Sequence, residues 1–502
     1  MPRYSTILRP SIPSVVTISI AASCLRRGSQ PTPLAPAREC CKLRCKVLTP
    51  RQPSGDAPIE PQPFSAAGAV PVRPRWQGPR GSAAAWCLYD WANSSYPTVI
   101  VTFVFAAYFT RGVAVSPEEG TAQWGLMLSL SGVALAVLAP VLGAIADQGG
   151  GRKPWIGGFT AVAAVCAVLL WWIEPDQSFV LPALLLVAVG NTAFEFGHVF
   201  YNAMLPEVAP KSHLGRLSGW AGGLGYAGGL LCLTLCLALF VMPERPLFGL
   251  DKERMEEVRI TGPFVGLWFA VFALPLFLMV RETPAPFSPA RAVRGGLKSL
   301  WSTLRLLPHH KQTGQFLLAR MLYTDGLNTL FAFGGIYAAG TFGMSFQDIL
   351  IFGILLNITA GLGAVAFAWI DDLVGAKFTI LASVGSLVVL GAAILVVDSQ
   401  TWFYVLGCGI GVFIGPAQTA SRSFMARVAP PDLRAEFFGL YALSGKATAF
   451  LGPALVGWIT LWAGSQRAGM ATILVFFLAG MALLWSVRDP QREGVVPVQP
   501  QG

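Results

Sequence analysis

Apolar runs of twenty residues or more recur along this chain from residue 83 to residue 488. A run of that length matches the hydrocarbon thickness of a bilayer, and a buried helix of a small soluble domain does not need it. Charged residues make up 12% of the 502 residues, whereas soluble domains average about 25%. The sequence therefore predicts an all-α integral membrane protein.

Twelve of these runs are predicted to cross the membrane as helices. The predicted spans are 83–110, 121–146, 154–173, 178–204, 216–242, 262–281, 313–340, 346–370, 378–398, 401–426, 435–462 and 468–487. The longest internal connection separates the sixth span from the seventh and divides the chain into two six-helix bundles. We expect an N-terminal bundle at 83–281, a cytoplasmic linker at 282–312, a C-terminal bundle at 313–488 and a short cytoplasmic tail at 489–502.

Lysine and arginine are unevenly distributed between the two sets of connections. If the N-terminus is cytoplasmic, the inner connections and the C-terminal tail hold sixteen of them, Arg422 and Arg427 included, and the outer loops hold six. Short cytoplasmic loops of membrane proteins carry such an excess of positive charge. The pattern favours a topology with both termini in the cytoplasm.

Residues 1–82 differ in composition from the rest of the chain. They carry twelve Lys and Arg against three acidic residues, which accounts for most of the net charge of +10. The remaining residues are close to neutral, so no nucleic-acid surface is expected on the membrane body. A segment that is rich in Arg and poor in acids is typical of a targeting peptide. A disordered cytoplasmic tail and a translated region upstream of the true start are the alternatives, and no fold is assigned to it.

The chain contains an internal repeat. Val208-Ala-Pro210 recurs as Val428-Ala-Pro430, and at the same offset of 220 residues Gly219 matches Gly439. Each copy links the fourth span of its bundle to the fifth. Two six-helix halves related by a parallel repeat resemble the layout of major-facilitator transporters, which bind substrate between the halves near the middle of the membrane.

Polar side chains occur in similar arrangements within the first and seventh spans. They are Tyr89, Asp90 and Asn93 in the first span and Tyr323, Asp325 and Asn328 in the seventh. An aspartate inside a membrane span is costly unless it faces a cavity or a partner. We therefore expect these residues to line a central cavity, where a carboxylate can bind the ammonium group of a substrate or carry a coupling proton. The alternative is that each aspartate caps a helix or pairs locally.

Further charged candidates lie in the fourth and eleventh spans. Glu195, His198 and Asn202 lie in the fourth span, and Glu195 is a second candidate for proton coupling. Lys446 lies about three turns into the eleventh span, where a lysine cannot easily reach the interface. It could pair with a carboxylate across the cavity or bind a substrate carboxylate. Glu195 and His198 have the spacing of half a dimetal site, but a second such set is missing, so no metal site is predicted.

Charged motifs follow the second and eighth spans. The first reads Gly143-Ala-Ile-Ala-Asp147-Gln-Gly-Gly-Gly-Arg152-Lys153, and the second reads Asp371-Asp372-Leu-Val-Gly375-Ala-Lys377. Both resemble the major-facilitator signature between the second and third helices, although the first copy has one extra residue before its basic pair. In that family these groups form inner-side charge pairs that hold one state closed. The resemblance implies a gating role for Asp147, Arg152, Lys153, Asp372 and Lys377. The alternative is a pair of basic loops that serve topology alone.

Nucleotide and cofactor motifs are not indicated. Gly223-Leu-Gly-Tyr-Ala-Gly228 matches a dinucleotide-binding pattern, but it lies inside the fifth span with no preceding strand. We interpret it as a small-residue face for helix packing. The G-x-x-x-x-G-K-[ST] pattern of ATP-driven pumps does not occur in the sequence. A membrane enzyme would need a convergent acid, base and nucleophile, and His198 is the one histidine within a predicted span. No enzymatic activity and no cofactor are therefore expected.

Several of these segments together resemble one branch of the major facilitator superfamily, the vacuole-effluxer-like branch. That branch includes the autophagy-related vacuolar amino-acid exporter of fungi and many bacterial members. The segments that carry the resemblance are Leu88-Tyr-Asp-Trp-Ala-Asn-Ser94, Phe200-Tyr-Asn-Ala203, Tyr323-Thr-Asp-Gly-Leu-Asn328, Ser421-Arg-Ser423, Glu436-Phe-Phe-Gly439 and Gly445-Lys446. The resemblance implies efflux of amino acids or similar small metabolites.

The sequence thus predicts a monomeric secondary transporter that moves a small, amino-acid-like metabolite by alternating access, with a proton as the coupling ion. A sensor built on a transporter fold, which binds ligand without moving it, is the alternative. Arginine outnumbers lysine 27 to 9, which favours a GC-rich genome and a bacterial inner membrane. An organellar or vacuolar membrane is the alternative. The partners expected are membrane lipid, the substrate and a proton, with no nucleic acid.

Overall fold

The computed structural model describes residues 80–149, 151–245, 247–282, 289–306 and 311–488. The predicted segment 1–82 therefore lies outside the described residues except for its last three, which begin the first helix. The predicted tail 489–502 also lies outside them, as do residues 283–288 and 307–310 of the predicted linker.

The described residues are predominantly helical. In the N-terminal part the long helices are α1 (Arg80–Asn93), α3 (Pro117–Gly149), α4 (Lys153–Leu169), α5 (Val180–Ala203), α7 (Leu214–Cys236) and α9 (Thr261–Met279). The short helices α2 (Phe105–Tyr108), α6 (Leu205–Val208) and α8 (Glu256–Arg259) lie between them. Helical turns from Tyr96 to Val113 continue α1 through α2.

The C-terminal part begins with α10 (Pro289–Leu306), inside the predicted linker. It continues with α11 (Lys311–Phe342), α12 (Phe346–Leu373), α13 (Ala376–Val396), α14 (Gln400–Val428), α15 (Arg434–Lys446), α16 (Leu451–Ala463) and α17 (Gln466–Trp485). The sequence does not predict the helix α10, because its few apolar residues do not form a run long enough to cross a membrane.

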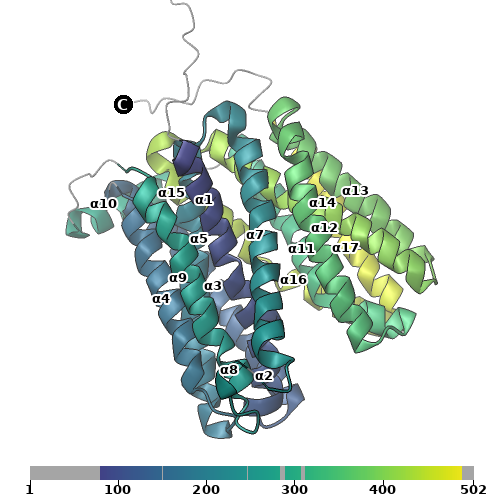
Figure 1. The fold of residues 1–502 in the computed structure, drawn as a ribbon. Coiled ribbons are helices and arrows are strands. Elements are labelled where there is room, and N and C mark those ends of the chain that lie inside the picture. Colours follow the sequence, from purple (N-terminus) through teal and green to yellow (C-terminus); the bar gives the residue numbers. More distant parts are fainter. Residues whose placement is uncertain (1–79, 150, 246, 283–288, 307–310, 489–502) are drawn as a thin grey trace, which may run out of the picture. The chain divides into compact units, whose positions relative to one another are not determined.

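The long helices form two groups, visible in Figure 1 as the purple-to-teal and the green-to-yellow helices. In the N-terminal group, α1 packs on α7 and α9, and α4 packs on α5 and α9. In the C-terminal group, α12 packs on α14, and α11 packs on α17. The most extensive contacts between the groups are those of α3 with α15 and of α7 with α12, and α14 also packs on α7.

The groups meet most closely where α3 and α12 end and where α7 and α15 begin; we call this the closed end. Glycines allow the backbones to approach there. A Cβ atom on Gly439 would lie 2.5 Å from the carbonyl oxygen of Ala139, and one on Gly219 would lie 2.5 Å from the carbonyl oxygen of Ala364. Those positions accept only a residue without a side chain, as is common where membrane helices cross closely.

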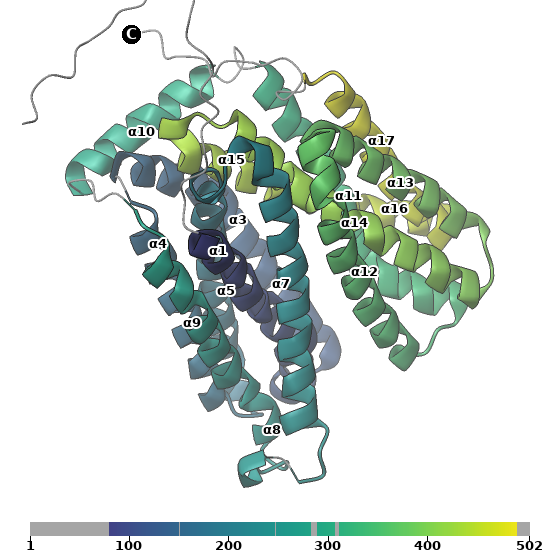
Figure 2. The ribbon, with the colours of Figure 1, turned by 45° about the horizontal axis from the view of Figure 1, so that its top comes forward.

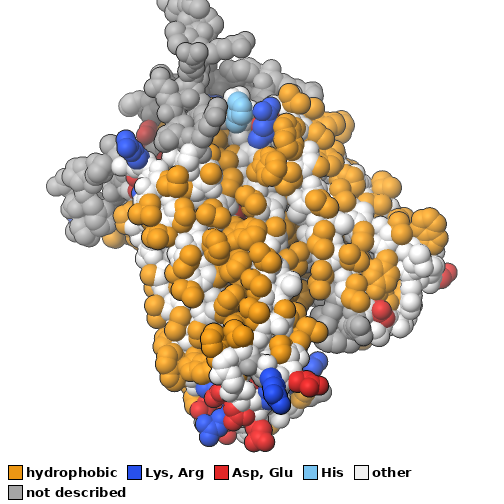
Figure 3. All heavy atoms as spheres, in the orientation of Figure 1, with side chains coloured by type: hydrophobic (Ala, Val, Ile, Leu, Met, Phe, Trp, Pro, Cys, Tyr) orange, Lys and Arg blue, Asp and Glu red, His pale blue; other side chains and the backbone are white. Residues whose placement is uncertain are grey.

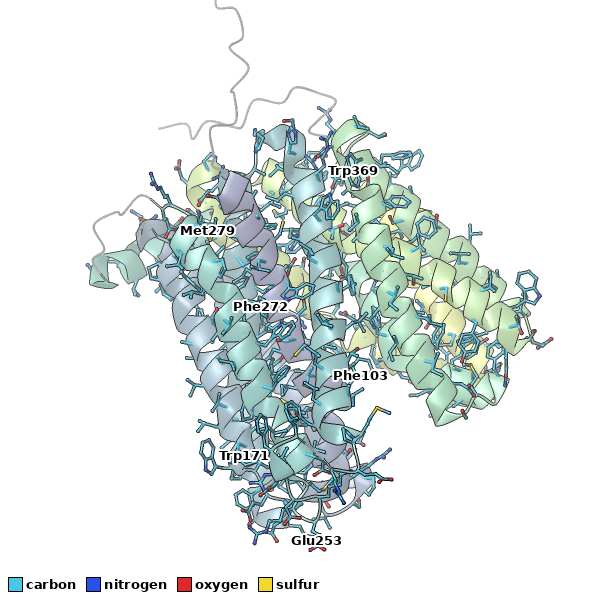
Figure 4. The ribbon with its side chains drawn as sticks, viewed as in Figure 1. Phe103, Trp171, Glu253, Phe272, Met279 and Trp369 are labelled. Atoms are coloured by element: carbon cyan, nitrogen blue, oxygen red, sulfur yellow. The ribbon has the colours of Figure 1, made fainter. Side chains whose placement is uncertain are left out.

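Large apolar side chains are exposed along the outer faces of the helices. On α9, Leu267, Val271, Leu274 and Leu278 recur every three or four residues, and each is more than half exposed. Figure 3 shows apolar side chains over the middle of this face, with acidic and basic side chains gathered at one end, where Figure 4 labels Glu253. Met279 lies at the opposite end of α9 in Figure 4. A soluble monomer rarely exposes so much apolar surface, whereas lipid covers it in an integral membrane protein.

Ten helical segments among the described residues are long and apolar enough to cross a membrane. The predicted spans 313–340 and 435–462 are not among them, for physical reasons that differ. The helix α11 has 32 residues, so its length suffices, but Arg320, Asp325 and Asn328 lower its hydropathy. The second segment is interrupted between α15 and α16, which have 13 residues each. The first segment therefore falls short in hydropathy, and the second falls short in the length of its helices.

Candidate functional site

A cavity of about 420 Å³ lies between the two helix groups. Most of the polar residues singled out in the sequence line it. They are Asp90, Asn93, Glu195, Asn202, Tyr323, Asn328 and Lys446, and His198 joins them. They come from α1, α5, α11 and α15, so a ligand in the cavity would touch both groups at once. Binding cavities of this size hold small organic molecules.

The guanidinium of Arg422 lies at the centre of the buried polar network. From α14 it donates through Nη1 to Asp90 Oδ2 at 3.0 Å and to Asn202 Oδ1 at 3.3 Å. Its Nε and Nη2 donate to the hydroxyl and the carbonyl of Ser218 on α7, at 2.9 and 2.6 Å. Arg422 is 6% exposed. One side chain of the C-terminal group thus binds three helices of the N-terminal group.

Aromatic rings flank this ion pair. The Arg422 guanidinium lies 5.2 Å from the ring centre of Trp86 and 5.9 Å from that of Tyr201, and these two rings stack at 4.3 Å. Such rings attract a cation through their negative faces. His198 stacks on Tyr201 and places Nε2 3.9 Å from Asp90 Oδ1. The arrangement holds Arg422 and Asp90 in fixed positions beside the cavity.

A second pair of opposite charges crosses the cavity. Lys446 Nζ on α15 lies 2.9 Å from Glu195 Oε1 on α5, and both side chains are partly exposed to the cavity. The predicted pairing of Lys446 with a carboxylate across the cavity is therefore formed. Arg320 lines the same wall, where it donates to the carbonyl of Tyr441 and the hydroxyl of Ser444 and lies over the Tyr441 ring. The cavity thus carries charges of both signs.

Four asparagines line this space, Asn357 on α12 among them. Asn202 accepts from Arg422, and Asn328 donates to the carbonyl of Gly445 at 3.4 Å. The Nδ2 group of Asn93 is buried and has no hydrogen-bond partner among the described residues. An unpaired buried donor is costly, and this one belongs to a residue of the cavity wall.

Two predicted site residues do not line the cavity. Tyr89 is buried within the N-terminal group, and its hydroxyl is 2.7 Å from that of Thr160. Asp325 is 1% exposed and faces the break between α15 and α16, where a Cβ atom on Gly452 would lie 3.1 Å from its Oδ1. Neither of its oxygens forms a hydrogen bond of good geometry with the described residues. The expectation that Asp325 lines the cavity beside Asp90 is therefore corrected, because the rotation of α11 turns it toward α16.

At the closed end, Asp147 connects the last turn of α3 to the first turn of α15. Its carboxylate accepts from the backbone N–H groups of Ala435 and Glu436, at 3.1 and 2.8 Å, and pairs with Arg152 at 3.1 Å. Arg152 also binds Glu207. A carboxylate at a helix N-terminus satisfies unpaired N–H groups and complements the positive end of the helix dipole.

Asp372 makes the equivalent connection in the other half. At the end of α12 it accepts from the backbone N–H groups of Gly215 and Arg216 in the first turn of α7, at 2.8 and 3.0 Å. It also binds Arg427 Nη2 at 3.1 Å, and Arg427 Nη1 binds Asp371 at 2.6 Å. The two halves therefore hold each other's helix N-termini through carboxylates at positions related by the internal repeat.

The basic residues of these two motifs bind differently from each other. Arg152 pairs with Asp147 as the motif predicts, whereas Lys153 donates to the carbonyls of Phe277 and Val280. The predicted pair of Asp372 with Lys377 is not formed, because Lys377 donates to the carbonyl of Trp485 instead. Arg427 takes the place that was expected for Lys377.

Sequence reasoning missed the role of Arg422, Arg427 and Ser218 in this network. The count of loop charges includes both arginines, yet α14 extends to Val428 and buries them. One signal was available, because Arg422 lies within the predicted span 401–426 and is as costly there as an intramembrane aspartate. Ser218 carries no such signal, since a serine inside a helix is common.

Comparisons with known proteins agree with this architecture. The family described as "Vacuole effluxer Atg22 like" matches residues 121–493. The Bacillus subtilis (strain 168) MFS-type transporter YxiO is 25% identical over 403 residues, which cover 80% of this chain and 93% of the relative. Autophagy-related protein 22 of Coccidioides immitis (strain RS) is 25% identical over 492 residues, covering 80% of each chain.

Solved structures of major facilitator superfamily proteins share the fold. FucP in the outward conformation superposes with a TM-score of 0.65 at 12% identity, over 82% of this chain and all of that one. The proton:xylose symporter XylE superposes with a TM-score of 0.62 at 12% identity, over 82% and 96%. At such low identity the likeness concerns the fold. This chain is an integral membrane transporter of the major facilitator superfamily and belongs to the vacuole effluxer Atg22-like family.

Proposed function

We propose that the protein is a secondary transporter with twelve membrane helices, in which α11 and the broken pair α15–α16 complete the set. The observation that carries the proposal is the cavity between the helix groups, crossed by the pairs Asp90–Arg422 and Glu195–Lys446. In each pair the carboxylate belongs to the N-terminal group and the cation belongs to the C-terminal group. A substrate that competes for these charges would change the contact between the groups, which is what alternating access requires.

An amino-acid-like zwitterion fits this chemistry. Each of the two cavity carboxylates is paired with a cation, and Arg320 adds a third positive charge to the wall. A zwitterion can offer its carboxylate to Lys446 or Arg422 and its ammonium group to Glu195 or Asp90, exchanging internal ion pairs for pairs with the substrate. A substrate carboxylate without an accompanying ammonium group would leave the protein carboxylate that it displaces buried without a partner, which is costly.

Efflux coupled to a proton is the second part of the proposal. Asp325 supports it, because a buried carboxylate without a good hydrogen bond is poorly stabilised as an anion. Its position beside the break between α15 and α16 would let protonation act on the helix that carries Lys446. Glu195 is the alternative carrier, and it would couple by direct competition with Lys446.

The closed end faces the cytoplasm in this proposal, with both chain termini on that side, so the cavity would be accessible from the opposite side. The excess of Lys and Arg in the connections at this end supports the assignment. The membrane proposed is a bacterial inner membrane, and a vacuolar or other organellar membrane is the alternative, since the relatives come from both bacteria and fungi. We propose a monomer as the working unit.

Flux measurements in proteoliposomes test the function directly. Purified protein is reconstituted, and uptake of radiolabelled neutral amino acids is followed with and without an imposed pH gradient, against protein-free liposomes. Accumulation driven by the gradient supports a proton-coupled transporter. Binding of an amino acid, seen as a rise in thermal stability, without any flux would instead identify a sensor.

A further inference from the structure

The helix α10 presents three different faces. Gly296, Leu300 and Thr303 are buried, whereas Val293, Leu297 and Trp301 are 43%, 48% and 60% exposed and recur at every fourth residue. Among the basic side chains of α10 that the structure describes, Arg294, Lys298 and Arg305 are exposed. At 100° per residue they form a stripe directly beside the apolar one. The helix contains no acidic residue.

The buried face fixes α10 against the closed end. A Cβ atom on Gly296 would lie 2.8 Å from the backbone of Ile145, so the two helices approach closely near the end of α3. Ser299 donates to Glu436 Oε2 at 3.0 Å, which ties α10 to α15 as well. Figure 2 shows α10 running across the ends of the long helices, transverse to them. These contacts determine which side of α10 turns away from the protein.

The helix α10 lies level with the end of an apolar segment. Its contact with α3 lies at Ile145, three residues before the end of the apolar segment Glu119–Gln148. A helix transverse to the spans at this level lies at the boundary between headgroups and acyl chains. Trp301 is an aromatic residue of the kind enriched there, and the Arg305 guanidinium lies 4.9 Å from the centre of its ring.

We propose that α10 docks on the membrane surface and binds anionic lipid headgroups. Val293, Leu297 and Trp301 enter the acyl boundary, and Arg294, Lys298 and Arg305 contact the headgroup phosphates from the adjacent stripe. A basic amphipathic helix binds in this way through its buried apolar area together with charge attraction. The absence of acids from α10 makes the attraction specific for negative lipids. The proposal does not depend on the substrate or on transport.

Hydrogen exchange of the α10 amides measures this docking in the full chain. The protein is placed in nanodiscs of phosphatidylcholine alone and in nanodiscs that contain phosphatidylglycerol. We expect the α10 amides to exchange at least about fivefold more slowly with phosphatidylglycerol, the ratio that corresponds to one Lys or Arg near an anionic surface. The variant Arg294→Gln/Lys298→Gln/Arg305→Gln should lose this difference, and amides of α3 and α5 report whether it remains folded.

The matched control is Arg245→Gln/Lys252→Gln/Arg254→Gln, which removes three exposed charges from the opposite end of the molecule and should keep the lipid effect. If the variant of α10 does not fold, the unmodified protein is measured in about 1 M salt instead. The Debye length is then about 3 Å, so the attraction to the lipid headgroups is screened and the protection should disappear. Equal exchange in both lipids overturns the proposal. The proposal is also overturned if inorganic phosphate protects the α10 amides equally well in phosphatidylcholine discs. It is overturned as well if the protection requires two copies of the protein per disc.

Discussion

Arg422 on α14 donates to Asp90 on α1 at 3.0 Å, across a separation of 332 residues in the chain. Both side chains are more than nine-tenths buried. The pair therefore joins the two helix groups within the polar wall of the cavity. Removing one partner from a buried ion pair leaves an uncompensated charge, which is more costly than replacing both.

The variant Asp90→Asn should lower the free energy of unfolding by about 3–5 kcal/mol, since Arg422 would lose its charged partner. The double variant Asp90→Asn/Arg422→Gln should recover part of this stability and remain inactive in flux assays. Chemical or thermal unfolding in detergent provides the measurement. Asp398→Asn is the control, because its pair with Arg467 is exposed and is worth about 0–1 kcal/mol. A stable, active Asp90→Asn protein would contradict the role of the pair.

The variant Lys446→Gln should raise the KM for a zwitterionic substrate by roughly tenfold to a hundredfold, the range for loss of one hydrogen bond to a charged group. The stabilisation of the protein by that substrate should decrease in parallel. Lys211→Gln, which removes an exposed lysine outside the cavity, should leave both quantities unchanged. An unaltered KM for Lys446→Gln would exclude this lysine from substrate binding.

The variant Asp325→Asn should separate coupling from binding. Because Asp325 lies outside the cavity, exchange of substrate across the membrane at equilibrium should persist, whereas accumulation driven by a pH gradient should disappear. Both are measured in the same proteoliposomes. Asp90→Asn should lose both activities. Gradient-driven accumulation by Asp325→Asn at the rate of the unmodified protein would show that another group, with Glu195 as the next candidate, carries the proton.

Asp147→Asn and Asp372→Asn should each favour opening of the closed end. Each carboxylate accepts two backbone N–H groups from the opposite half, and a charge at a helix N-terminus contributes up to about 2 kcal/mol. Spin labels on α3 and α15 should report a larger population of long distances in either variant. The effects should add in the double variant, since the two contacts share no residue. Unchanged distances in the double variant would rule out a role of these two carboxylates in holding the end closed.

Two glycines of α3 offer a matched pair. A Cβ atom at Gly143 would overlap the carbonyl oxygen of Ala435, whereas one at Gly132 would meet nothing within 4 Å. Gly143→Ala should therefore open the closed end at a cost of about 1–3 kcal/mol to the present arrangement. Gly132→Ala should leave the distribution of distances between spin labels on α3 and α15 unchanged. The same labels on α3 and α15 measure both, and an identical response of the two variants would argue against close packing as the cause.

Much of the candidate site could be predicted because the cost of polar groups in hydrocarbon is local. Asp90, Glu195 and Lys446 each stand out in an apolar run, and all three line the cavity. Their partners could not be predicted in the same way. Asp90 was matched with Asp325 through the internal repeat, but equivalent positions in a repeat need not touch, and the contact is made by Arg422.

The sequence by itself determined that the chain is an integral membrane protein, where its apolar segments lie and to which family it belongs, because length, hydropathy and short motifs are properties of contiguous residues. Only the tertiary structure decided which side of each helix faces the cavity. The rotation of a helix depends on packing against neighbours that lie far away in the chain. That packing turned Asp325 toward α16, brought Arg422 to Asp90, replaced Lys377 with Arg427 and left the apolar stripe of α10 exposed.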